Sequence, residues 1–154
     1  MRKLSSSVLS IALIMFSFST YAAEPKQKEK SITATGSFDI KLEPQKDSDA
    51  PAGRMIIRKT YSGDLAATAI GQMLSKRIKG GAAAYSAVEE VSGTLAGKTG
   101  SFTLIHYGFM SQQERKLEVY VLPGSGTGEL SNISGTLDII QAGGKHEYVF
   151  KYVL

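Results

Sequence analysis

The chain has 154 residues, of which 42% are hydrophobic and 21% are charged, so it can build one domain around one core but not a two-domain enzyme. It contains no Cys and only two His, which excludes disulfides, thiolate chemistry and iron–sulfur clusters and argues against a dedicated metal site. The formal net charge of +4 is small and the clusters of Lys and Arg are thin, so we expect no nucleic-acid partner.

Residues 1–22 have the pattern of a secretory signal peptide. Arg2 and Lys3 form a basic start, residues 8–18 are mostly apolar, and the small residues Thr20 and Ala22 precede a cleavage site. The apolar stretch is too short for a membrane span, which takes roughly 20 residues. We therefore expect cleavage after Ala22 and an exported protein that does not span a membrane, located in the periplasm of a bacterium or secreted. Residues 23–30 predict a polar linker.

Residues 31–154 predict an all-β domain, because short alternating apolar and polar runs are separated by glycine-rich turns. One segment is ambiguous: residues 65–74 are rich in Ala, and the spacing of Leu74 and Ile78 fits one helical turn, but we favour a strand that leads into a hairpin at Gly80 and Gly81. The predicted strands cover residues 32–42, 55–61, 65–74, 83–91, 102–109, 116–122, 133–140 and 146–154. Eight antiparallel strands in so short a chain are best protected from edge pairing by closure, so we predict an eight-stranded β-barrel.

Two glycine-rich segments resemble phosphate-binding loops but fail on spacing or charge. Residues 124–128 lack the Lys that would compensate a phosphate and are followed by Glu129, and residues 93–99 are one residue short between their glycines. No local pattern supports a nucleophilic Ser. We interpret both segments as turns and expect no cofactor.

Several longer motifs occur in one order along the domain. They are TYSGDL at residues 60–65, GTLAGKTGSF at 93–102, VLPGSGTGEL at 121–130, and His146 with Tyr148 and Tyr152 near the end. In this order the chain, over residues 31–154, resembles the bacterial DUF3224 family. That resemblance implies a small antiparallel barrel of the allene oxide cyclase type and implies no known reaction, because the family has no assigned function.

Strand alternation places one candidate site inside this barrel. Phe102, Leu104 and His106 share a face of their strand, and Glu89 on the neighbouring strand is the obvious carboxylate to hold the imidazole of His106. If Glu90 faces inward instead of Glu89, the pair fails. The functional interpretation is a buried Glu89–His106 pair with pKa values shifted toward neutrality that abstracts and returns a proton; the structural one is a polar pair that fixes strand register.

The remaining candidate residues would surround a ligand. The residues we expect at a ligand are Tyr85, Phe102, Leu104, His146, Tyr148 and Tyr152. A metal site made of Glu89, His106 and His146 is a minor alternative, and we predict no metal.

Three functions follow from this interpretation. The leading one is binding of a small, largely apolar ligand in the barrel lumen. The alternatives are a cofactor-independent isomerase, cyclase or lyase that uses Glu89, His106 and a Tyr, and a protein-interaction module whose partner could be a second copy of the chain.

Overall fold

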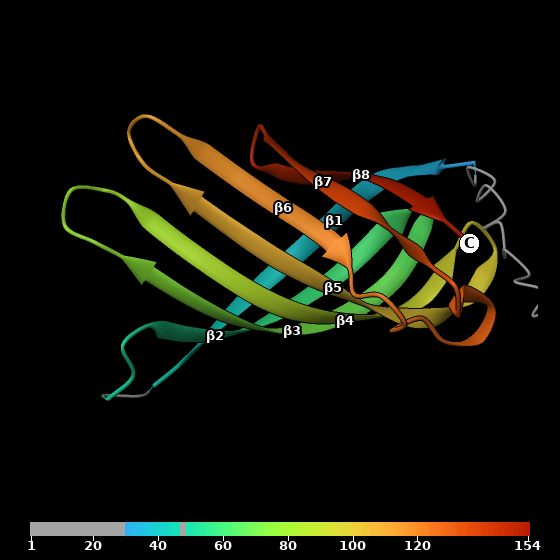
Figure 1. The fold of residues 1–154 in the computed structure, drawn as a ribbon, viewed down its shortest axis with the longest axis horizontal. Helices are drawn as coiled ribbons and strands as arrows, with labels where there is room; N and C mark the ends of the chain where they lie inside the picture. Colours follow the sequence, from blue (N-terminus) through green and yellow to red (C-terminus); the bar gives the residue numbers. More distant parts are fainter. Residues whose placement is uncertain (1–29, 47–48) are drawn as a thin grey trace, which may run out of the picture.

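The computed structural model describes residues 30–46 and 49–154, which form one closed antiparallel barrel (Figure 1). The predicted signal peptide and nearly all of the predicted linker lie outside the described residues. Each strand pairs with its neighbours in sequence, and β1 pairs with β8 to close the wall. The strands are β1 (Ile32–Gln45), β2 (Gly53–Gly63), β3 (Leu65–Arg77), β4 (Ala83–Leu95), β5 (Lys98–Met110), β6 (Arg115–Val121), β7 (Ser134–Ala142) and β8 (Lys145–Val153).

The predicted barrel is confirmed, and so is the strand assignment for the ambiguous segment. β3 alternates buried and exposed residues along most of its length, and its inward positions are mostly small, including Ala67, Ala69 and Gly71. The β2–β3 turn at Gly63 and Asp64 is also as predicted. The β4–β5 turn is tighter than predicted: Ala96 and Gly97, both with positive φ, make the turn, and β5 already begins at Lys98.

β1 runs through Pro44, where the sequence predicted a loop. Residues 32–37 of β1 pair with β8, whereas residues 36–45 pair with β2, so beyond residue 37 the strand has a partner on one side only. Proline lacks an N–H and is tolerated on such an edge. The loop therefore begins after Gln45 rather than at Pro44.

The two ends of the barrel differ. At the end that holds the starts of β1, β3 and β5, a 3-10 turn, η1 (Gly128–Leu130), inserts Leu130, which is 1% exposed, and Ile133 packs beside it. The hydroxyl of Tyr148 accepts a hydrogen bond from the Leu65 N–H at 2.9 Å at this closed end. At the opposite end the β3–β4 and β5–β6 hairpins extend as long arms (Figure 1). The core therefore fills one half of the barrel and leaves the other half open.

The extent of strand pairing differs around the barrel wall. β3 and β4 pair from Leu65↔Leu95 to Arg77↔Ala83, whereas β6 and β7 are joined by the single pair Tyr120↔Thr136. The β7–β8 hairpin pairs within itself along its whole length.

Among the described residues, no helix has the length and apolar character needed to cross a membrane.

Candidate functional site

Four polar side chains lie together inside the barrel, between the filled half and the open half. They are Lys59 and Tyr61 on β2, Glu89 on β4 and His106 on β5, and each is at most 5% exposed. Glu89 and His106 face inward as the sequence predicted, because Glu89 pairs with Leu104 and His106 pairs with Ala87 on adjacent strands. Glu90 faces outward and is exposed.

Gly71 makes room for the carboxylate. It pairs with Glu89 across β3 and β4, and a Cβ added at Gly71 would come within 3.1 Å of the Glu89 Cβ and 2.8 Å of the Val88 carbonyl oxygen. Lys59 pairs with Ala69 on β3, so its long side chain passes over small residues to reach β4. The small inward residues of β3 thus let Lys59 and Glu89 meet.

Glu89 is the centre of the cluster. The Lys59 Nζ donates to Glu89 Oε2 at 2.7 Å and to the Tyr61 hydroxyl at 3.1 Å, and that hydroxyl donates to Glu89 Oε1 at 2.8 Å. The His106 Nε2 lies 2.8 Å from Glu89 Oε2, but it is not aligned for a hydrogen bond. The Lys59 ammonium also lies 4.7 Å from the centre of the Phe38 ring.

The electrostatics of the cluster keep Glu89 ionised. Burial by itself raises the pKa of Glu89, but the contact with His106 and the charge of Lys59 outweigh it and lower the pKa to about 2. Burial lowers the pKa of Lys59, and the carboxylate of Glu89 opposes that shift. Burial and then the negative charge of Glu89 raise the pKa of Tyr61, so this residue remains a phenol that can donate.

This arrangement does not suit Glu89 to proton transfer. We expected the pKa of Glu89 to move toward neutrality, but it moves the other way, because the contact with His106 and the positive charge of Lys59 outweigh burial. Lys59 was not predicted to lie inside the barrel. A carboxylate with a pKa near 2 is a weak base at neutral pH. Its oxygens are already occupied by partners within the wall, and Glu89 does not line the open cavity.

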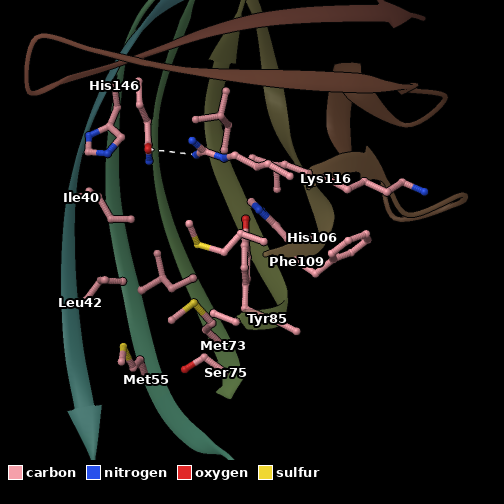
Figure 2. Close-up of a pocket in the computed structure, with 18 of the residues that line it drawn as sticks. Ile40, Leu42, Met55, Met73, Ser75, Tyr85, His106, Phe109, Lys116 and His146 are labelled. Atoms are coloured by element: carbon pink, nitrogen blue, oxygen red, sulfur yellow. Dashed lines mark hydrogen bonds between the residues drawn. The ribbon is translucent and has the colours of Figure 1, made fainter. Parts of the chain in front are cut away.

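Above the cluster, the open half of the barrel contains a cavity of about 530 Å³ (Figure 2). Lys59 and His106 lie at its floor, next to the buried Glu89. All eight strands contribute to its walls, which are mainly apolar. The large apolar side chains include Ile40 and Leu42 on β1, Met55 and Ile57 on β2, Met73 on β3, Phe109 on β5, Leu117 on β6 and Ile139 on β7. The volume is in the range of small-molecule sites, roughly 300–1,000 Å³.

The residues predicted to contact a ligand fall into two groups. Tyr85 and His146 line the cavity, as does His106, the residue predicted to act with Glu89. The ring of His146 stacks on Phe38 with 5.1 Å between centroids. The other four residues are at most 2% exposed, pack in the core and are absent from the lining of this cavity: Phe102, Leu104, Tyr148 and Tyr152. Alternation identified the inward face correctly, but it does not distinguish the filled half of a barrel from the hollow half.

Lys59 was not among the residues predicted for the site. The alternation of side chains along a strand could have identified it. Ile57, Lys59 and Tyr61 are two residues apart and share one face of β2, so a strand that buries Ile57 and Tyr61 must also turn Lys59 inward. Within residues 30–46 and 49–154, no three His, Asp or Glu residues lie close enough to hold a metal ion.

Comparison with known proteins gives a family and a fold. The model of the family described as "Protein of unknown function (DUF3224)" matches residues 34–152. A crystal structure of a DUF3224 protein of unknown function from Shewanella oneidensis MR-1 is similar to this chain, with 39% sequence identity and a TM-score of 0.75 over 81% of this chain and 98% of that one. No curated protein matches.

Proposed function

The chain belongs to the DUF3224 family, and from the geometry of its cavity we propose that it binds a small, largely apolar ligand in the open half of the barrel. The observation that carries this proposal is a half-hollow barrel: one end is sealed by Leu130, and the other holds a cavity of about 530 Å³ with apolar walls. A barrel filled by its own side chains throughout would instead have favoured an interaction module.

The polar floor supports a binding role more than a catalytic one. His106 and Lys59 hold Glu89 in its ionised form. Glu89 therefore suits a fixed charge beneath the cavity better than a general acid or base. Lys59 and His106 can offer hydrogen bonds to a polar group on an otherwise apolar ligand. The isomerase, cyclase or lyase alternative, which required Glu89 as a base, gains no support from this geometry.

The location of the protein forms part of the same proposal. If residues 1–22 are removed after export, the cavity meets its ligand outside the cytoplasm, in the periplasm or the medium. N-terminal sequencing of the protein recovered from its bacterium tests this: Ala23 is expected as the first residue, and an intact Met1 would contradict the proposal.

Ligand binding can be tested with a neutral apolar fluorophore, N-phenyl-1-naphthylamine, whose emission rises in an apolar site. Met73 lines the cavity, and Leu74, the next residue of β3, is on the outer face and 45% exposed. We expect Met73→Trp to fill the cavity and weaken binding at least about ten-fold, the equivalent of roughly 1.4 kcal/mol. Leu74→Trp is the matched control and should change affinity less than about two-fold.

Two outcomes would contradict the proposal. One is a wild-type protein that binds neither this fluorophore nor any of a panel of neutral apolar compounds. The other is equal weakening by Met73→Trp and Leu74→Trp, which would place the bound fluorophore outside the cavity. If the proposal holds, native mass spectrometry of the protein recovered from its own bacterium would identify the natural ligand by its mass.

A further inference from the structure

We propose that the ligand of this cavity is an amphipathic anion, with its apolar body among the walls and its acidic group at the mouth, held by Arg115 and Arg77. This inference rests on the proposed function and adds the chemical class of the ligand. It comes from the distribution of charge around the cavity and from the register of the strands that end at its mouth.

Charge is segregated at the cavity. The whole chain has 18 Lys and Arg against 14 Asp and Glu, close to balance. Among the described residues that line the cavity, by contrast, there are cations but no carboxylate; the cations are Lys59, Lys76, Arg77, Arg115 and Lys116. An apolar space with a positive opening attracts an apolar molecule that carries a negative group.

Strand register selects two of these cations. Along β6, Val121, Val119 and Leu117 face the interior, and Arg115 continues this alternation at the mouth. Along β3, Gly71, Met73 and Ser75 face the interior, and Arg77 continues it. Both guanidinium groups therefore belong to the inward rows of their strands, at the rim of the cavity.

The other cations are engaged elsewhere. Lys59 at the floor is paired with Glu89. Lys76 and Lys116 belong to the outward rows: Lys76 donates to the carbonyl oxygen of Pro51 at 2.6 Å, and Lys116 pairs with Glu118 at 2.9 Å. Figure 2 shows Lys116 extending away from the cavity. This leaves Arg77 and Arg115 to meet an anion.

Arg115 is oriented by a neutral partner. Its Nη2 donates to the side-chain oxygen of Gln141 on β7 at 3.3 Å, and Gln141 also lines the cavity. A guanidinium has five N–H donors in a planar fork, so one bond to Gln141 leaves donors for a carboxylate, which it can bind through two parallel hydrogen bonds. Gln141 therefore holds Arg115 at the mouth without neutralising it.

The depth of the cavity sets the length of the apolar body. Lys59 at the floor and Met55 near the mouth are four residues apart on β2, which is about 13 Å at roughly 3.3 Å per residue. An extended chain of ten carbons is roughly 11 Å long, from carbon–carbon bonds of about 1.5 Å at tetrahedral angles. Decanoate is thus a suitable probe, and 1-decanol and decylammonium have the same chain with a neutral or positive end.

The experiment measures displacement of N-phenyl-1-naphthylamine by these three compounds at low ionic strength. We expect decanoate to bind at least about five-fold more tightly than 1-decanol, and decylammonium to bind more weakly than both. The preference for decanoate should decrease in 0.5 M salt, because exposed charges are screened.

Two double variants test whether the position of the cations in the inward rows matters, and not only their charge. Arg77→Gln with Arg115→Gln should reduce decanoate affinity about 3- to 20-fold and leave 1-decanol unchanged. Lys76→Gln with Lys116→Gln makes the same change of charge on the same strands, in the outward rows, and should weaken decanoate less than about two-fold.

Three other outcomes would each contradict a specific part of the proposals. Equal affinity for decanoate and 1-decanol overturns the anion assignment while the proposed function stands. Equal effects of the two double variants overturn the role of Arg77 and Arg115. No displacement by any of the three compounds, together with no binding of the fluorophore, overturns both proposals.

Discussion

Replacing Glu89 with Gln removes the one carboxylate of the buried cluster while keeping nearly the same side-chain shape. The ammonium of Lys59, whose side chain is only 3% exposed, then loses its charged partner and gains little hydration in return. The hydroxyl of Tyr61 loses a charged acceptor, and the contact with His106 loses its charge as well. The cost is therefore mainly that of an unpaired buried cation.

Two independent estimates give the size of this effect. The pKa of Glu89 falls from 4.5 to about 2, a difference that corresponds to about 3 kcal/mol in favour of the ionised form in the folded protein. Removing one partner of a buried ion pair costs about 3–5 kcal/mol. We expect Glu89→Gln to lower the free energy of unfolding by about 3 kcal/mol at pH 7.

Urea unfolding followed by far-ultraviolet circular dichroism measures this change. Glu90→Gln is the matched control, because Glu90 is the next residue of β4 and faces solvent; it should cost less than about 0.5 kcal/mol. Combining Lys59→Met with Glu89→Gln removes the unpaired cation, so the double variant should be at least about 1 kcal/mol more stable than Glu89→Gln alone. A Glu89→Gln variant as stable as Glu90→Gln, or costs that simply add in the double variant, would refute the reasoning.

Three further predictions concern acid stability and the sealed end of the barrel. Because the folded-state pKa of Glu89 is below its unfolded value, its stabilisation is present above about pH 4.5 and is lost as the pH falls toward 2; urea midpoints at pH 3 and pH 6 should differ less in Glu89→Gln than in the wild type. Leu130→Ala should cost about 2–5 kcal/mol in urea unfolding, because Leu130 seals the closed end, and should leave fluorophore binding at the other end unchanged; a cost below about 1 kcal/mol would contradict the sealing role. Tyr148→Phe should cost about 1–2 kcal/mol by the same measurement, since the Leu65 N–H loses its acceptor, and an unchanged midpoint would show that this bond contributes nothing.

The fold could be predicted from the sequence because the relevant signal is local. Alternation of apolar and polar residues sets which side chains turn inward, and glycine-rich turns set where strands end, so eight strands and a closed barrel followed. Errors occurred where tertiary context overrides local preference. Pro44 stays within β1 because that part of the strand is an edge, which depends on where β8 stops pairing.

The candidate site was only partly predictable, for the same reason. Glu89 and His106 were placed together by parity and register, and the structure brings their side chains to 2.8 Å. Whether the pair suits proton transfer depends also on Lys59, whose charge helps to lower the pKa of Glu89. Lys59 lies two strands away from Glu89 and 30 residues earlier in the chain. Which inward residues line a cavity depended on the insertion of Leu130 at one end, a long-range contact that alternation does not encode.

The single residue pair between β6 and β7 makes this seam the weakest line along the barrel wall. Besides this backbone pair, the side-chain bond from Arg115 to Gln141 crosses the seam. The β7–β8 hairpin can therefore part from β6 by giving up fewer interstrand hydrogen bonds than any other opening of the wall requires. Gln141, which orients Arg115 across this gap, travels with the hairpin. Amide exchange along β7 should accordingly be the fastest in the sheet, because opening this seam breaks fewer interstrand hydrogen bonds than opening the continuous pairing from β2 to β5.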